Sequence, residues 1–256
     1  MPKTKKKENP KKEEMVLNLD TLGVPIAIIL SGVVIAALIF FSSRGGSTVK
    51  DTTGETQNTN DSTQDTSTTG SDVVVSYENE PYLGDGANAK VAIVEFSDYM
   101  CGYCQRHSEE TFPKIKENYI DTGKIIYVFK EFPLSAAGQI GYTIAEGGAC
   151  LFDLAGNEEF AEYHKKAFFA ESKDVLIALA GELGVDTEEF GRCLEDGRFR
   201  EAVNINSNDG RKIGITGTPG FVVGLIGDDG NVTGTIIAGA FPYETFADAI
   251  DKLLKE

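Results

Sequence analysis

The chain has 256 residues, and its 40 acidic side chains outnumber the 24 basic ones, which gives a formal net charge of −16. A surface of that sign repels phosphates, and no basic patch interleaved with aromatic residues is present, so the composition argues against DNA or RNA as a partner. The four cysteines are an even number, as expected of paired thiols in an exported domain, although sequence alone does not determine their pairing.

Residues 1–41 have the pattern of a membrane anchor. The first fourteen residues contain six lysines and three glutamates, and residues 22–41 then carry no charge. At 1.5 Å of rise per helical residue, this run spans about 30 Å of hydrocarbon, whereas the apolar core of a cleaved signal peptide has only about 7–15 residues. We expect a transmembrane helix at 22–41, with residues 1–21 in the cytoplasm because lysines stay on that side.

Residues 42–72 have a composition typical of a flexible tether. They are rich in Ser, Thr, Gly, Asn, Gln and Asp and contain few large apolar side chains. Such a segment buries too little surface to offset the entropy of ordering it. We therefore expect a single globular domain at 73–256, on the outer side of the membrane.

The first half of this domain contains two short apolar runs, at 91–96 and 125–129, that are typical of buried strands. The segment between them predicts a helix over 104–119. Pro113 should kink or interrupt that helix, because proline has no N–H to donate.

The second half begins with a helical stretch at about 135–211, in which Asp186 and Glu189 form a plausible capping box. Strands are predicted at 221–224 and 235–237. A last helix carries an apolar face made of Phe246, Ile250, Leu253 and Leu254. The order strand, helix, strand, helical block, two strands, helix predicts an α/β domain of thioredoxin type with helices inserted in its middle.

Cys101 and Cys104 are separated by two residues, directly after a predicted strand and at the start of a predicted helix. In that place the Cys101 sulfur meets unpaired backbone N–H groups and the positive end of the helix dipole. Both favour the thiolate, so they lower the pKa of Cys101 and make it a nucleophile and a good leaving group. Cys104 lies one turn further on, close enough to attack a mixed disulfide and release the substrate.

Three other uses of this cysteine pair fit the sequence less well. A c-type haem site needs His directly after the second cysteine, where Gln105 stands. Structural zinc needs four ligands, but Cys150 and Cys193 are 43 positions apart and form no second pair, and His107 is expected on the helix surface. A purely structural disulfide that closes so short a loop adds little stability. Metal binding or delivery remains the alternative from a different functional class.

Four segments resemble the DsbA-like branch of the thioredoxin superfamily. Residues 94–104 (VEFSDYMCGYC) are similar to its active-site segment, and residues 214–221 (GITGTPGF) to its cis-proline loop. Shorter matches are residues 132–134 (FPL) and 239–243 (GAFPY). The likeness covers about residues 82–256 in the right order. It implies a thioredoxin fold with an inserted helical subdomain, and thiol–disulfide oxidoreductase activity.

The resemblance also implies roles for residues near the cysteines. Pro219 would form a cis peptide bond facing them, and the Thr218 backbone would pair with an extended substrate segment; the alternative is an ordinary trans proline in a Gly-rich turn. The dipeptide Gly102-Tyr103 differs from the Pro-His of the best-known DsbA. Since that dipeptide tunes the thiolate, the oxidising strength stays open.

Glu95 interrupts an apolar strand six positions before Cys101. A central strand covered on both faces would bury its carboxyl group, so we expect a raised pKa and proton exchange with Cys104. The resemblance places an acidic residue here for the same role. The alternative is a glutamate that faces solvent at a sheet edge.

Cys150 and Cys193 both lie in the predicted helical insert. Our hypothesis is a second, stabilising disulfide that ties two helices together, as in some DsbA-like proteins. The alternative is a redox relay between the two cysteine pairs. His164 lies on a predicted helix and is expected to be a surface or packing residue.

Taken together, these features predict a monomeric, membrane-anchored enzyme that introduces disulfides into newly exported or unfolded proteins outside the cytoplasm. No organic cofactor and no metal are expected. By family analogy, a membrane oxidase of the DsbB or VKOR type would re-oxidise the cysteine pair. The alternatives are a disulfide reductase or isomerase, which the reduction potential separates from an oxidase, and the metal-binding module.

Overall fold

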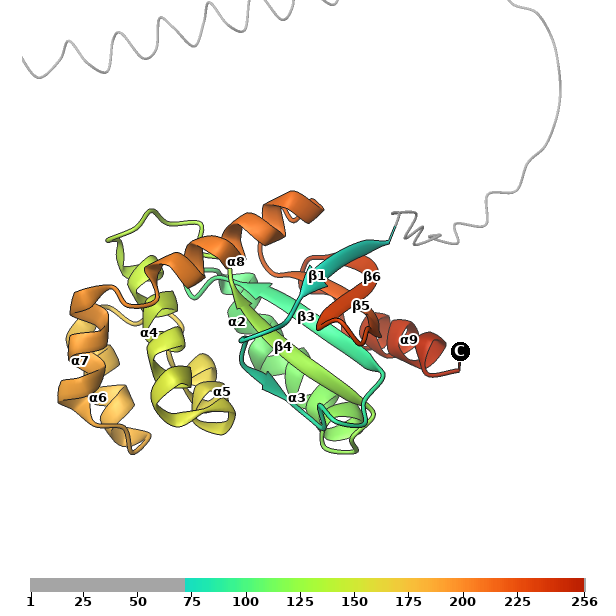
Figure 1. The fold of residues 1–256 in the computed structure, drawn as a ribbon, viewed down its shortest axis with the longest axis horizontal. Helices are drawn as coiled ribbons and strands as arrows, with labels where there is room; N and C mark the ends of the chain where they lie inside the picture. Colours follow the sequence, from blue (N-terminus) through green and yellow to red (C-terminus); the bar gives the residue numbers. More distant parts are fainter. Residues whose placement is uncertain (1–71, 256) are drawn as a thin grey trace, which may run out of the picture. The chain divides into compact units, whose positions relative to one another are not determined.

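The computed structural model describes residues 72–255, which contain one six-stranded sheet flanked by helices (Figure 1). In chain order the strands are β1 Val73–Ser76, β2 Tyr82–Leu83, β3 Val91–Ser97, β4 Ile125–Glu131, β5 Gly220–Ile226 and β6 Asn231–Ala238. Across the sheet their order is β1-β6-β5-β3-β4-β2. β3 and β4 are parallel, and the other neighbouring pairs are antiparallel. The α/β class is confirmed.

The four strands expected from the sequence are all present, and each is longer than predicted. The sequence patterns did not reveal β1 and β2, which pair with β6 and β4 at the two edges of the sheet. These strands have four and two residues. Segments so short contain too few alternating residues to produce a recognisable strand pattern.

The helix that follows β3 is divided into short segments, α2 Gly102–Arg106, η2 His107–Thr111, α3 Phe112–Ile115 and η3 Lys116–Ile120, where η marks π-helical turns. Pro113 lies in the first turn of α3. It follows directly on the π-helical turn η2, where the N–H of Phe112 donates to the His107 carbonyl, so the regular α-helical hydrogen-bond pattern is broken next to the proline. The predicted interruption at Pro113 is confirmed.

The helical block between β4 and β5 is also confirmed, and Figure 1 shows α4–α7 gathered beside one end of the sheet. Its helices are α4 Ile140–Ala155, α5 Asn157–Lys166, α6 Lys173–Glu182, α7 Thr187–Asp196 and α8 Arg200–Ile213. Asp186 caps α7, because its Oδ1 accepts hydrogen bonds from the N–H groups of Glu188 and Glu189 at 3.0 and 2.9 Å. The last helix is α9 Tyr243–Leu253.

The two faces of the sheet pack against different helices. Val91 and Ile93 of β3 belong to a buried cluster that includes residues of α3 and α9, whereas Ala92 and Val94 belong to a cluster on the opposite face. α8 lies against β1, β3 and β4. Successive side chains of a strand point to opposite faces, so Glu95 points to the same face as Val91 and Ile93, toward the α3–α9 side.

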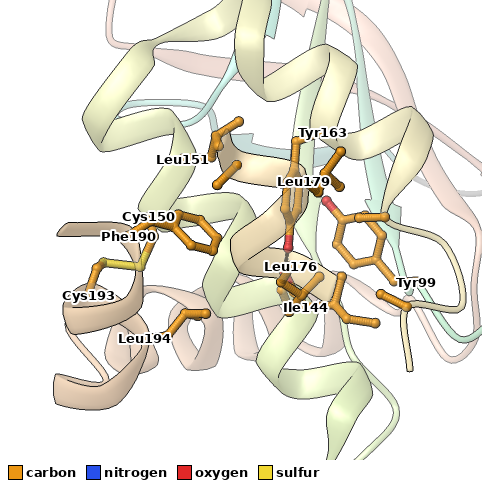
Figure 2. Close-up of a cluster of buried hydrophobic side chains, with 14 of the residues drawn as sticks. Tyr99, Ile144, Cys150, Leu151, Tyr163, Leu176, Leu179, Phe190, Cys193 and Leu194 are labelled. Carbon is orange, nitrogen blue, oxygen red and sulfur yellow. Dashed lines mark hydrogen bonds between the residues drawn. A yellow bond between two sulfur atoms is a disulfide. The ribbon is translucent and has the colours of Figure 1, made fainter. Parts of the chain in front are cut away.

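The helical insert has an apolar core of its own, which Figure 2 shows with the Cys150–Cys193 disulfide at its edge. The disulfide joins α4 to α7, with the two Cα atoms 6.1 Å apart. The Tyr163 hydroxyl donates a hydrogen bond to the Ile144 carbonyl at 2.9 Å, so it is satisfied inside this core. The helices of the insert are therefore held together both by packing and by a covalent link.

The expected N-terminal segment at 1–21, membrane anchor at 22–41 and nearly all of the tether at 42–72 lie outside the described residues. Among residues 72–255, no helix combines the length and the apolar character needed to cross a bilayer.

Candidate active site

Cys101 is the residue directly before α2, with an extended backbone at φ −99° and ψ 115°. Its carbonyl oxygen accepts hydrogen bonds from the N–H groups of Cys104 and Gln105, both at 3.1 Å, which starts the helix. The Cys101 N–H donates to the Asp98 carbonyl at 3.0 Å. This turn holds the nucleophilic candidate at the junction between β3 and α2, as the sequence predicts.

The surroundings of Cys101 lower its pKa from 9.0 to about 5. The main cause is the Cys104 thiol, which donates a hydrogen bond to the Cys101 sulfur. Partial burial opposes this lowering of the pKa. Hydrogen bonds from Thr218 and from the backbone N–H groups of Tyr103 and Cys104 lower the pKa further. At neutral pH Cys101 is therefore a thiolate when the pair is reduced.

Cys104 lies in the opposite environment. Its side chain is fully buried, and burial is the main cause that raises its pKa far above the usual range, with further contributions from Cys101 and Glu95. A buried thiol that resists ionisation must receive a proton whenever it leaves a disulfide as a thiolate. The two sulfurs thus differ in exposure and in protonation, as separate nucleophilic and resolving roles require.

The Thr218–Pro219 peptide bond is cis, and the loop that contains it faces Cys101. The Cys101 Sγ lies 3.3 Å from the Thr218 carbonyl oxygen, which accepts a hydrogen bond from Cys101 only while that cysteine is protonated. Residues 214–220, together with Ala238 and Gly239, line a shallow pocket of about 250 Å³ beside this contact. An extended chain in this pocket would lie next to the sulfur that it has to reach.

Glu95 is 1% exposed, on the central strand β3 rather than at a sheet edge. Burial raises its pKa from 4.5 to about 7, while the hydrogen bond from Tyr127 opposes that shift and the charge of Cys101 adds to it. The alternative of a solvent-facing glutamate is wrong. A carboxyl group that titrates near neutrality beside a cysteine with a raised pKa is suited to proton exchange.

Two buried residues of this site were missed by sequence reasoning. The Tyr127 hydroxyl donates to Glu95 Oε2 at 2.8 Å, and His107 Nε2 lies 3.0 Å from the same hydroxyl. The expectation that His107 lies on the helix surface is wrong, since it is 1% exposed. Its spacing of three residues from the buried Cys104 places both on one helical face, and that was the available signal.

The active-site dipeptide is the most accessible part of the site. Both Gly102 and Tyr103 are exposed, and the Arg106 guanidinium lies 5.0 Å from the centre of the Tyr103 ring. Arg106 Nη2 also donates to the Ala240 carbonyl at 3.3 Å, which links α2 to the loop before α9. Tyr103 is therefore held beside Cys101 with one ring face supported by a cation.

The other cysteines and the second histidine lie in the helical insert. Cys150 and Cys193 are fully buried and bonded to each other. His164 is buried as well, so of its two expected positions the packing one is observed. Within residues 72–255 no group of three or more His, Cys, Asp or Glu side chains is arranged to hold a metal ion.

A family model described as "Thioredoxin" matches residues 76–252, which is more than half of the chain. The chain belongs to the thioredoxin family. A protein of Rickettsia conorii named as a protein-disulfide oxidoreductase is 27% identical over 182 residues, covering 70% of this chain and 62% of that protein. The chain thus spans a little under two thirds of the length of the rickettsial relatives it matches. Disulfide bond formation protein D of Bacillus subtilis is 26% identical and is covered over 79% of its length.

Solved structures place the chain among the DsbA-like members of the thioredoxin family. α-DsbA1 of Wolbachia pipientis is 28% identical with a TM-score of 0.60, covering 70% of this chain and 92% of that one. Oxidised BdbD of Bacillus subtilis is 25% identical with a TM-score of 0.61, covering 71% and 96%. The resemblance stated from the sequence motifs is confirmed.

Proposed function

We propose that this protein is a thiol–disulfide oxidoreductase that introduces disulfides into cysteine-containing proteins outside the cytoplasm. The observation that carries the proposal is the contrast between the two sulfurs of one CxxC pair, with a pKa of about 5 at Cys101 and a strongly raised pKa at Cys104. A stabilised Cys101 thiolate favours the reduced pair over its disulfide. A disulfide whose reduced form is stabilised oxidises other thiols.

The proposed reaction starts from the Cys101–Cys104 disulfide. A substrate thiolate attacks the Cys101 sulfur, the bond to Cys104 breaks, and Cys104 leaves as a thiolate that takes up a proton. A second substrate thiol loses its proton and attacks the substrate sulfur of the mixed disulfide, which releases Cys101 as the stable thiolate. Two electrons pass to the protein, the substrate gains one disulfide, and the Cys101/Cys104 dithiol remains.

The reduced pair needs an oxidant for the next cycle. We propose a quinone-linked membrane oxidase of the DsbB or VKOR type, which would remove two electrons from the pair while the single proton on Cys104 is released. The uncharged run at 22–41 supports a location at the membrane. Residues 42–72 would serve as a tether. Through this tether, a monomeric domain would reach both the oxidase and the chains that emerge from export.

The direction of electron flow is tested by the reduction potential of the Cys101/Cys104 pair in a glutathione buffer, followed by alkylation and mass measurement. We expect a potential higher than about −180 mV, on the oxidising side of protein disulfide isomerase. A value near about −270 mV, as in thioredoxin, would identify a reductase instead. The Cys101→Ser variant is the inactive control, and tight Zn(II) binding without disulfide exchange would favour a metal-binding module.

The proposed location is tested separately, in intact cells that express the full chain. After brief treatment of the intact cells with a reductant, we expect a membrane-impermeant maleimide to label Cys101 without cell lysis and the protein to fractionate with membranes. Labelling that appears only after lysis would contradict the outward orientation.

A further inference from the structure

A hydrogen-bonded chain of three buried side chains leads away from the active-site cysteines. Glu95 of β3 accepts a hydrogen bond at Oε2 from the Tyr127 hydroxyl of β4, at 2.8 Å. His107 Nε2 lies 3.0 Å from the same hydroxyl oxygen. The residues come from different elements, so the sheet register and the packing of the helix after β3 bring them together.

Each end of this chain has one atom free. Glu95 Oε1 and His107 Nδ1 are buried and have no hydrogen-bond partner within residues 72–255. His107 also forms part of the lining of a surface pocket of about 390 Å³, together with Arg106, Glu110, Thr111, Lys114 and residues 240–244. One end therefore lies beside the cysteine pair, and the other belongs to a residue that lines a surface pocket.

We propose that Tyr127 and His107 form a proton relay that connects Glu95, and through it Cys104, to the protein surface. The relay rests on the proposed function, because it serves the step in which Cys104 leaves the disulfide as a buried thiolate. A thiolate buried without a cation beside it costs free energy. The step therefore needs a proton that reaches Cys104 through the protein interior.

The proton count of the relay is balanced. Glu95 starts as the neutral acid with its proton on Oε1 and gives that proton to the Cys104 thiolate. The Tyr127 hydroxyl passes its proton to Glu95 Oε2, His107 Nε2 passes one to Tyr127, and His107 Nδ1 takes one from the surface pocket. One proton has moved from outside to Cys104, and every relay group is again neutral. When Cys104 is re-oxidised, the same transfers run backward.

The surroundings of His107 suit a neutral relay. Its ring packs against Tyr127 of β4, Phe221 of β5 and Phe246 of α9. The titratable groups that act on it are Tyr127, through the hydrogen bond, and the buried His164, through its charge. Burial lowers the pKa of His107 to about 3. The imidazole therefore stays uncharged, and a neutral imidazole carries a proton on one nitrogen while the other accepts.

The same domain contains a second triad of this kind, which provides a matched control. The Tyr99 hydroxyl donates to Glu131 Oε1 at 3.1 Å, and His164 Nδ1 lies 3.1 Å from that hydroxyl. Glu131 and His164 are buried in the same way as Glu95 and His107. Glu95 of the first triad is among the groups that raise the pKa of Cys104, whereas Glu131 and His164 of the second triad are not.

The test uses the full-length chain in its oxidised form, mixed with a peptide that carries two thiols. The rate of Cys104 release is measured by quenched flow with alkylation between pH 5 and 8, in H₂O and in D₂O. The variants are His107→Gln, Tyr127→Phe and the control His164→Gln. The glutamine at position 107 keeps a hydrogen-bonding nitrogen but cannot take up one proton while it releases another. Circular dichroism and the alkylation rate of Cys101 monitor the fold.

We expect His107→Gln and Tyr127→Phe to slow the release of Cys104 roughly tenfold or more, with a larger solvent isotope effect. His164→Gln should match the wild type, and the double variant His107→Gln/Tyr127→Phe should be no slower than Tyr127→Phe alone. A His107→Gln protein that keeps the wild-type rate and isotope effect would overturn the relay. Should that variant not fold, Tyr127→Phe decides, because it removes a single oxygen. A wild-type chain that exchanges no disulfide would instead overturn the proposed function.

Discussion

The sulfur of Cys101 lies 3.3 Å from the carbonyl oxygen of Thr218, a residue 117 positions further along the chain. This contact brings the start of α2 against the loop that leads into β5, so the nucleophile and the candidate docking backbone belong to one site. Thr218 also carries a buried hydroxyl without a partner in the described part of the chain, and that group can donate to the thiolate.

The low pKa of Cys101 should depend on the neighbouring thiol. Because the hydrogen bond from Cys104 is the largest cause of the shift, Cys104→Ala should move the pKa of Cys101 from about 5 back toward 9.0. Cys104→Ser retains an O–H donor of similar size and should keep most of the shift. The thiolate absorbance at 240 nm, followed from pH 3 to 10, measures both values.

Equal Cys101 pKa values in the alanine and serine variants would contradict this account. They would mean that the backbone N–H groups of Tyr103 and Cys104, rather than the Cys104 side chain, hold the thiolate.

Glu95 should make the fold less stable at high pH. Its pKa is about 7 in the folded chain, against 4.5 for an unburied carboxyl group, so the folded state binds the proton more tightly than the unfolded state. Its contribution is fully present below pH 4.5 and is lost as the pH rises through about 7. A shift of this size corresponds to about 3 kcal/mol. Glu95→Gln should therefore stabilise the reduced protein at pH 8 and change little at pH 4.

Urea unfolding of the wild type and the variant at both pH values measures this difference. Glu131 is also buried with a raised pKa to which the charge of Glu95 contributes, so the comparison is repeated in a Glu131→Gln background. Glu109→Gln, at an exposed glutamate, should leave the pH dependence unchanged. A gain for Glu95→Gln that is equal at pH 4 and pH 8 would contradict the assignment.

The chemistry of the site was readable from local sequence, whereas its network was not. Cys101, Cys104 and Glu95 are conspicuous because a CxxC pair follows a strand and a carboxylate interrupts an apolar run. Tyr127 fits an apolar strand equally well as a packing residue. Its partnership with Glu95 depends on the register of β3 against β4, which pairs Glu95 with Phe129, and no local pattern encodes that register.

The position of His107 shows the same limit. A polar residue in a helix is usually placed toward solvent, and that expectation failed because this face of the helix packs onto the sheet. Loop chemistry was more informative: the glycines and Pro219 of residues 214–220 indicated a turn, although only the fold brings that turn to Cys101.

The Cys150–Cys193 disulfide should stabilise the insert without taking part in exchange. It closes a loop of 43 residues, for which restriction of the unfolded chain predicts about 4 kcal/mol, and measured values of about 2–4 kcal/mol are typical. The double variant Cys150→Ala/Cys193→Ala should lower the unfolding free energy by about 2–4 kcal/mol. It should leave the reduction potential of the Cys101/Cys104 pair unchanged. Denaturant titration and the glutathione assay measure the two quantities. A changed potential would instead favour a redox relay between the pairs.

Removing the Glu80 carboxylate should lower the stability of the fold. Its Oε1 lies 2.9 Å from the Nζ of Lys130, whose side chain is only 2% exposed, and its Oε2 accepts from Asn206 Nδ2 at 2.9 Å. This ion pair ties the loop between β1 and β2 to β4 and α8. Glu80→Ala leaves a buried ammonium group whose remaining partner among the described residues is the Ser76 carbonyl, so we expect a loss of roughly 3 kcal/mol.

The exposed pair of Lys212 and Asp209, 3.2 Å apart, is the matched control for that prediction. Asp209→Ala should cost less than about 1 kcal/mol, because water and salt screen this pair. Replacing both buried partners in Glu80→Ala/Lys130→Met should recover part of the loss, since no unpaired charge then remains inside. Guanidinium unfolding of the four proteins at pH 7 gives the comparison. Equal losses for Glu80→Ala and Asp209→Ala would mean that the Lys130 ammonium reaches water when its partner is removed.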